Sequence, residues 1–259
     1  MTAAVVLAVT GLLLVVLAWA TARRPLHEIS DKEGYFDRWA VLHGGYDPRT
    51  GNPWLRGWLT MVYTVARPLA RRGISPDVLT ISSIWLAGAV FLPLELGGRW
   101  AILAGWVLVV SGLFDTLDGC VAALENRTSR WGYVLDSAVD RVNDVVYLVA
   151  VVSVGAPPGL AVACGFLFFF LEYVRARAGN AGGGDVGRIT VAERPSRVIV
   201  LAASLHFGGV FLGYRELVAT IGMALIALLT LVGVGQLLIA VRRQLLDLPD
   251  EPAVQVPEA

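Results

Sequence analysis

The chain of 259 residues is 56% hydrophobic and only 16% charged, and its mean hydropathy is +0.65. These values lie outside the usual range of soluble proteins and argue against a separate water-soluble domain. The 21 basic and 21 acidic residues cancel, so the net charge gives no indication of a nucleic-acid partner. We therefore expect an all-α integral membrane protein that contacts membrane lipids.

The first apolar run, residues 3–22, is long enough to cross a bilayer, which takes about 20 residues. Positive charge follows this run at Arg23 and Arg24 instead of preceding it, and this pattern favours a retained helix over a cleaved signal peptide. Residues 1–22 are therefore expected to form an N-terminal transmembrane anchor.

The polar segment 23–74 contains a candidate amphipathic helix that we expect to lie on the membrane surface. Arginines and threonines occupy one face, and the apolar positions on the other face are Leu55, Trp58, Leu59, Val62, Val65, Ala66 and Leu69. Pro68 is expected to kink this helix because proline lacks the amide hydrogen of a regular turn.

Six further apolar segments predict a six-helix membrane domain over residues 75–243. The segments are 76–96, 101–124, 133–154, 157–174, 196–212 and 217–241. Most arginines outside these segments fall on alternate loops, so the positive-inside rule predicts an external N-terminus and a cytoplasmic C-terminus. Residues 244–259 are polar and contain proline, and are expected to form a disordered cytoplasmic tail.

Four aspartates lie in two consecutive predicted spans, where an ionised side chain is costly and calls for a partner or a function. Asp115 and Asp118 are three residues apart, Asp136 and Asp140 are four apart, and each pair therefore shares one helix face. The loop between them is short, so we expect antiparallel neighbouring helices whose acidic faces converge. Such a cluster suits hard cations such as Mg²⁺, Mn²⁺ or Ca²⁺, which hold diphosphates, and it leaves one carboxylate to act as a base.

These aspartates belong to a longer pattern. It resembles the signature of the CDP-alcohol phosphatidyltransferase family, D-x2-D-G-x2-A-R-x8-G-x3-D-x3-D, at every spacing, through Asp115, Asp118, Gly119, Ala122, Gly132, Asp136 and Asp140. One position departs, because Ala123 stands where the family has arginine. The segment from Ser75 to Thr80 is also similar to the P-N-x-L-T start of the first core helix of this family, with Asp77 in place of the asparagine.

The resemblance implies a reaction and a metal site. Members of this family move a phosphatidyl-type group from a CDP-linked lipid such as CDP-diacylglycerol to an alcohol, and CMP leaves. By resemblance Asp115, Asp118 and Asp136 hold Mg²⁺ or Mn²⁺, and Asp140, at the same metal site, is the base that deprotonates the acceptor. The resemblance also implies a multi-pass protein of the cell membrane with a cytoplasmic active site, and homodimers are common among its members.

Donor binding is implied in the same way. Three small residues of the motif would let the cytidine diphosphate approach the helix backbones, namely Gly119, Ala122 and Gly132. The absent arginine leaves the nucleotide contact open, and Arg127 or Arg130 is a candidate replacement because a guanidinium pairs well with phosphate.

The segment from Glu193 to Arg197 is similar to the E-R-P-x-R segment of phosphatidylinositol phosphate synthases, whose arginines bind the acceptor phosphate. This resemblance implies Arg194 and Arg197 as acceptor contacts, with inositol phosphate as the first candidate and glycerol phosphate, serine or other polar alcohols after it. Both arginines also fit the positive-inside rule, with Pro195 starting a helix, so a purely topological interpretation stays open.

Two other functions remain as alternatives at this stage. Intramembrane acids occur in ion and proton transporters, although here all four lie near one membrane face and mark no path across it. Because Ala123 replaces the arginine of the motif, the chain could also be a catalytically silent relative with a scaffold role.

Overall fold

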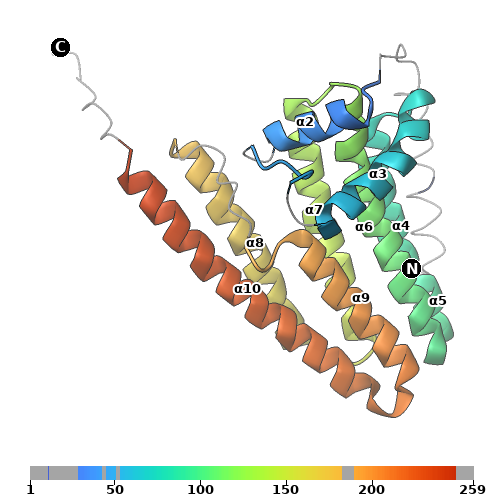
Figure 1. The fold of residues 1–259 in the computed structure, drawn as a ribbon. Helices are drawn as coiled ribbons and strands as arrows, with labels where there is room; N and C mark the ends of the chain where they lie inside the picture. Colours follow the sequence, from blue (N-terminus) through green and yellow to red (C-terminus); the bar gives the residue numbers. More distant parts are fainter. Residues whose placement is uncertain (1–10, 12–28, 43–44, 51–52, 183–189, 249–259) are drawn as a thin grey trace, which may run out of the picture.

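The computed structural model describes residue 11 and residues 29–42, 45–50, 53–182 and 190–248 (Figure 1). Regular structure in this part of the chain is helical. In chain order the helices are α2 (Lys32–Leu42), α3 (Pro53–Arg71), α4 (Pro76–Ala89), α5 (Phe91–Leu96), η1 (Gly98–Trp100), α6 (Ala101–Leu124), α7 (Arg130–Ser153), α8 (Pro158–Asn180), α9 (Arg194–Val210), η2 (Leu212–Tyr214) and α10 (Arg215–Leu246). Apart from Gly11, the predicted anchor lies outside the described residues, as does the end of the predicted tail.

Four helical stretches of the described chain are long and apolar enough to cross a membrane: Pro76–Leu96, Gly98–Leu124, Pro158–Asn180 and Leu212–Leu246. They coincide with four of the predicted spans, and the chain is a membrane protein. The other two predicted spans form helices, but α7 is interrupted by charged residues and α9 has only 17 residues. The count of six spans therefore stays a prediction.

The main core lies where the long helices meet. It contains fully buried residues of α6, α7, α8, α9 and α10, among them Leu108, Tyr147, Phe168, Leu205 and Met223. Small residues allow the helix backbones to approach, as at Gly209 of α9, where an added Cβ would lie 2.8 Å from the amide nitrogen of Ile102. Figure 1 shows α10 running along α8 and α9, and α10 packs against both of them.

The predicted pairing of the two aspartate helices is only partly correct. A short loop does join α6 to α7, but the two helices make little direct contact with each other. They are held by shared neighbours instead, because α4 and α9 each pack against both. The aspartates consequently meet across a space that side chains of α4 and α9 also reach.

Helix α3 is the predicted amphipathic helix, and it packs against α6. Its buried residues Leu59, Val62 and Ala66 form a second core with α2, α4 and α6. Trp58 and Val65, on the predicted apolar face, remain exposed. Because part of that face is covered by protein, only the exposed part is left to contact lipid, and the location at the membrane surface stays a prediction.

Candidate active site

Three of the four predicted aspartates meet in one cluster. Carboxylate oxygens of Asp115 on α6 and of Asp136 and Asp140 on α7 all lie within 4.8 Å of one another. Oxygens at this separation can share one divalent cation, because metal–oxygen distances are about 2.0–2.6 Å. Oδ1 of Asp115 is buried and has no hydrogen-bond partner among the described residues, so it is available as a ligand. The donor set fits Mg²⁺ or Mn²⁺.

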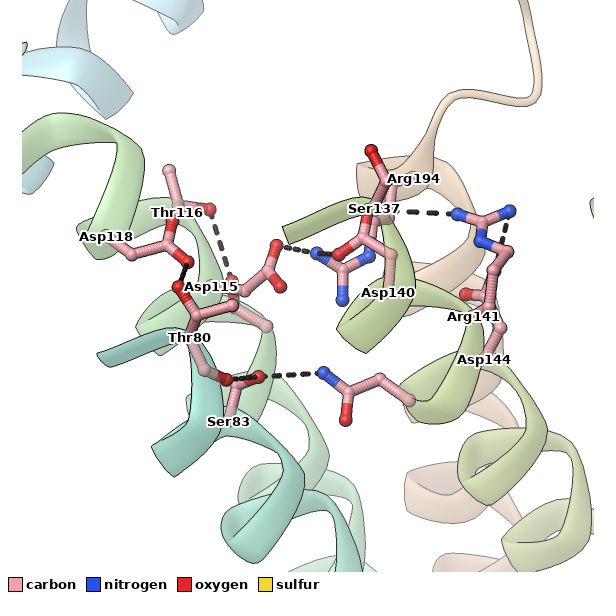
Figure 2. A network of polar contacts seen from close by, with 12 residues as sticks. Thr80, Ser83, Asp115, Thr116, Asp118, Ser137, Asp140, Arg141, Asp144 and Arg194 are labelled. Atoms are coloured by element: carbon pink, nitrogen blue, oxygen red, sulfur yellow. Dashed lines mark hydrogen bonds and ion pairs between the residues drawn. The ribbon is translucent and has the colours of Figure 1, made fainter. Parts of the chain in front are cut away.

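Asp118 lies beside this cluster and turns toward α4. Its side chain is buried, with 3% of the residue exposed. Its carboxylate accepts a hydrogen bond from the Thr80 hydroxyl (Figure 2) and another from the Gly119 amide. Asp118 is therefore outside the group of three, and its predicted role as a metal ligand remains a prediction.

A chain of buried hydrogen bonds continues from Thr80 into the bundle. Ser83 donates to the Thr80 carbonyl at 2.7 Å, and Asn143 of α7 donates to the Ser83 hydroxyl at 2.8 Å. Ser111 of α6 donates to the Ser83 carbonyl at 2.7 Å, and the Tyr147 hydroxyl donates to Ser111 at 2.8 Å. These bonds join α4, α6 and α7, so they hold the two aspartate helices at a set separation.

Arg194, a predicted acceptor residue, lies directly against the aspartates. Its Nη1 forms ion pairs with Asp115 and Asp140, which Figure 2 shows on either side of the guanidinium. Its Nε and Nη2 are buried and have no hydrogen-bond partner in the described part of the chain. Buried donors are normally bonded, so these two nitrogens have capacity for a ligand.

Arg197, the other predicted acceptor residue, has a different environment. The residue is 0% exposed, and each of its three guanidinium nitrogens donates to the protein: Nε to the Ala192 carbonyl, Nη1 to Asp144 and Nη2 to Glu172. The sequence predicted that Arg197 binds the acceptor phosphate and gave no sign of these protein partners, because they lie on α7, on α8 and in the loop before α9.

The donor-side residues of the motif lie on the same two helices. Gly119 faces open space, since an added Cβ would meet no atom within 4 Å. The Gly132 amide donates at 2.9 Å to the hydroxyl of Ser129, which caps the start of α7. Ala122 is partly exposed next to these positions. The absence of a side chain therefore leaves space beside the backbone at Gly119, whereas the Gly132 amide is already bonded to Ser129.

The position of Ala123, where the family motif has arginine, is buried in this structure. The residue is 3% exposed and belongs to the core between α2, α3 and α6, where a guanidinium would need buried partners. Arg127, the predicted replacement, forms an ion pair with Glu125 at 3.8 Å, not with the aspartate cluster. Its contact with the nucleotide therefore remains a prediction.

Three charged residues near the site were missed by the sequence interpretation. Arg141 and Asp144 of α7 and Glu172 of α8 lie in predicted spans and form ion pairs with one another and with Arg197. Asp144 lies four residues after Asp140, so the helical spacing that was used for the other aspartates would also have selected it.

The comparisons with known proteins agree with this geometry. The sequence model of the CDP-alcohol phosphatidyltransferase family matches residues 73–241. The chain belongs to this family. Its members transfer a phosphatidyl group from a CDP-linked lipid to an alcohol and release CMP, so the protein is a transferase of phospholipid biosynthesis.

Relatives within the family include phosphatidylinositol phosphate synthases. The enzyme of Cutibacterium acnes is 32% identical over 200 residues, which cover 72% of this chain and 95% of the relative. The crystal structure of the Mycobacterium tuberculosis enzyme with CDP-DAG bound is 27% identical, with a TM-score of 0.55, and the match covers 70% of this chain and 94% of that one. A structure of the same enzyme with manganese and citrate has 25% identity and a TM-score of 0.57, over 70% and 88% of the two chains.

Proposed function

We propose that this enzyme transfers the phosphatidyl group of CDP-diacylglycerol to a phosphorylated polar alcohol, with inositol phosphate as the first candidate. The observation that carries the proposal is Arg194, whose guanidinium lies against Asp115 and Asp140 and has two buried N–H groups without partners among the described residues. A phosphate monoester accepts from such a guanidinium in a bidentate way. The names of the relatives support inositol phosphate over other phosphorylated alcohols.

In the proposed mechanism, Asp140 removes the proton from the acceptor hydroxyl. The resulting oxygen attacks the phosphorus that carries the lipid alcohol, the bond to the CMP oxygen breaks, and CMP leaves. Arg194 orients the acceptor by its phosphate, so that its hydroxyl lies near Asp140. Asp115, Asp118, Asp136 and Asp140 would hold Mg²⁺ or Mn²⁺, and a metal bound there neutralises charge on the diphosphate.

The donor would lie along the α6–α7 side of the site. The small residues Gly119, Ala122 and Gly132 would let the cytidine diphosphate approach the helix backbones, and the open space at Gly119 supports this. Arg127 would reach the donor phosphates only after leaving Glu125, so we propose it as a secondary contact whose removal weakens donor binding modestly.

The same proposal covers the organisation of the chain. Residues 1–22 would form a transmembrane anchor, residues 23–74 a segment with the interfacial helix, residues 75–243 the six-helix catalytic domain and residues 244–259 a cytoplasmic tail. The arginines of the loops support an active site on the cytoplasmic side of the cell membrane. A homodimer is proposed from the family resemblance alone, and the mass of the purified protein in detergent tests it.

The decisive experiment supplies purified protein with CDP-diacylglycerol, Mg²⁺ or Mn²⁺, and one acceptor at a time. Inositol phosphate, inositol, glycerol phosphate and serine form the panel, and the lipid product is identified by mass spectrometry. We expect a phosphatidylinositol phosphate product, with CMP released in equal amount. Inositol is the matched control for the phosphate, because it differs from inositol phosphate only in that group.

Each result of this panel has a separate meaning. A product with another alcohol would change the acceptor and keep the reaction. Metal-dependent CMP release without inositol phosphate would show hydrolysis or a different acceptor. No turnover with any acceptor, in protein that still binds Mn²⁺, would favour the scaffold interpretation over the proposed enzyme.

A further inference from the structure

A second group of charged side chains lies next to the aspartates, and two of its members, Asp144 and Arg197, are almost fully buried. We call it the buried charge cluster, and it consists of Arg141, Asp144, Glu172 and Arg197. It joins three helices, with two residues from α7, one from α8 and one from α9. Two arginines face two carboxylates, so the cluster is electrically balanced, which is what charges removed from water require.

Arg197 is at the centre of this cluster. Its Nη1 lies 3.2 Å from Asp144 and its Nη2 lies 3.0 Å from Glu172. Its Nε donates to the Ala192 carbonyl at 3.1 Å, and its guanidinium lies 4.8 Å from the centre of the Phe168 ring. Three of its five N–H groups donate to the protein and 0% of the residue is exposed, so Arg197 is not accessible to a substrate in this structure.

Arg141 connects the cluster to the proposed base. Its Nη1 lies 3.3 Å from Asp144 and also donates at 3.3 Å to the Phe168 carbonyl, while its Nη2 lies 3.7 Å from Asp140. Asp140 therefore has the cluster on one side and Arg194 on the other. A change in the cluster can therefore reach Asp140 through Arg141.

The start of α9 connects the cluster to Arg194. Arg197 follows Arg194 by three residues on the same helix, which places them about one turn apart. Glu193, just before the helix, accepts from Arg175 of α8 at 2.9 Å and from the Thr190 hydroxyl at 2.9 Å. The first turn of α9 is consequently attached to α7 and α8 on both sides of Arg194.

We propose that Arg197 and Asp144 are positioning residues of the transfer reaction: they set Asp140 and Arg194 opposite each other and do not contact the acceptor. This inference rests on the roles proposed above for Asp140 and Arg194. The inference gives different roles to two arginines of the same predicted acceptor segment. Arg194 has nitrogens without hydrogen-bond partners in the described chain, whereas all three guanidinium nitrogens of Arg197 donate to protein atoms.

The test compares three variants: Arg197→Gln, Asp144→Asn and the double variant. Each single change leaves one charge without its partner, whereas the double variant leaves Arg141 paired with Glu172 and restores the balance. We expect each single variant to lose about 10- to 100-fold in kcat, the usual effect of removing a residue that orients a ligand-binding group. The double variant should regain at least tenfold over Arg197→Gln, and the KM for the CDP-lipid should stay within threefold throughout.

A binding measurement keeps the test independent of turnover. Inositol phosphate should raise the unfolding temperature of the double variant as it does that of the wild type, and it should fail to do so for Arg194→Gln. If inositol phosphate does not stabilise the wild type, the proposed acceptor is wrong, and the kcat comparison is then made with the acceptor that the panel identifies.

One pattern would overturn the inference. If Arg197→Gln raised the KM for the acceptor with kcat unchanged, and the double variant gave no recovery, Arg197 would contact the acceptor itself. If Arg197→Gln fails to fold, Arg197→Lys, which keeps the charge and loses the three-way fork, takes its place with the same expectations for kcat and for both KM values.

Discussion

The aspartate cluster and the buried charge cluster both include residues of α7, and the arginine beside the first differs from the arginine at the centre of the second in how its nitrogens are bonded. In the aspartate cluster, an oxygen of Asp115 and two nitrogens of Arg194 are buried without hydrogen-bond partners in the described chain. In the buried charge cluster, every nitrogen of Arg197 is bonded, although Oδ1 of Asp144 is also buried without a partner in the described chain. Unsatisfied buried donors are rare, so the difference between the two arginines separates Arg194, which can bind a ligand, from Arg197, which joins helices.

The largest expected effect comes from a change in the aspartate cluster, at the proposed base Asp140. Asp140→Asn keeps the shape of the side chain and removes its ability to take a proton, so CMP release should fall by about 10²- to 10⁴-fold. The rate of CMP release by purified protein measures this, with an unchanged unfolding temperature showing that the protein remains folded. Asp247→Asn, at the exposed end of α10, is the matched control. Wild-type turnover in Asp140→Asn would remove Asp140 from the mechanism.

The next effect tests the unpartnered donors of Arg194. Arg194→Gln removes the guanidinium that we expect to bind the acceptor phosphate, and hydrogen bonds to charged groups contribute about 1.5–3 kcal/mol. The KM for inositol phosphate should therefore rise about 10- to 100-fold, while binding of the CDP-lipid stays the same. Arg243→Gln, which changes an exposed arginine of α10, serves as the control. An unchanged acceptor KM would leave only the topological interpretation of Arg194.

A smaller effect concerns Asp118, which neither cluster contains. Thr80→Val removes the hydroxyl that donates to the Asp118 carboxylate and keeps the shape of the side chain. We expect the affinity for Mn²⁺ to fall about tenfold, as when other groups that orient metal ligands are removed. Titration calorimetry measures it. In Thr116→Val, the lost hydroxyl bonds only to the Gly112 carbonyl of its own helix, so its Mn²⁺ affinity should stay at the wild-type value.

If both valine variants bind Mn²⁺ like the wild type, the contact between Thr80 and Asp118 does not support the metal site. Asp118→Asn would then test Asp118 itself, and an unchanged Mn²⁺ affinity in that variant would leave a metal site of the three aspartates that meet in the structure.

The smallest expected effect is on stability, and its pH dependence tests whether the charge of Glu193 holds the start of α9. Burial alone would raise the pKa of Glu193, but hydrogen bonds from Arg175 and Thr190 outweigh burial and lower it. Glu193 therefore stabilises the fold fully above its unfolded pKa, near 4.5, and this stabilisation is lost as the pH falls through the lower folded pKa. We expect Glu193→Gln to lower the unfolding temperature by about 2–4 °C at pH 7.

This difference between wild type and Glu193→Gln should shrink as the pH falls below 4.5, since protonated wild-type Glu193 then resembles glutamine. Thermal unfolding of both proteins in detergent across this pH range measures it. A difference that is the same at every pH would mean that the charge of Glu193 does not hold the start of α9.

The sequence predicted the main membrane helices because runs of apolar residues are a local signal, and these runs predicted α4, α6, α8 and α10. Three- and four-residue spacing predicted that each aspartate pair shares one face. In the structure Asp115, Asp136 and Asp140 meet, whereas Asp118 turns toward Thr80 on α4. The motif then led to the family, which the match over residues 73–241 confirms. The roles of the individual site residues stay predictions.

Other features of the site depend on contacts between helices that are far apart in the chain. Asp118 turns to Thr80 on α4, 38 residues away in sequence, and Arg197 reaches Asp144 on α7, 53 residues away. Ala123 faces a core that α2 and α3 complete, so its environment could not be inferred from the motif alone.

What the sequence by itself determined is the membrane character of the chain, the position of its main helices, and the presence of paired aspartates and arginines. Only the tertiary structure decided that three aspartates meet and that Arg194 faces them. It also decided that Arg197 is fully buried and that its three guanidinium nitrogens donate to the protein. The physical reason is that helical periodicity is a local property, whereas the partner of a buried charge is chosen by how the helices pack.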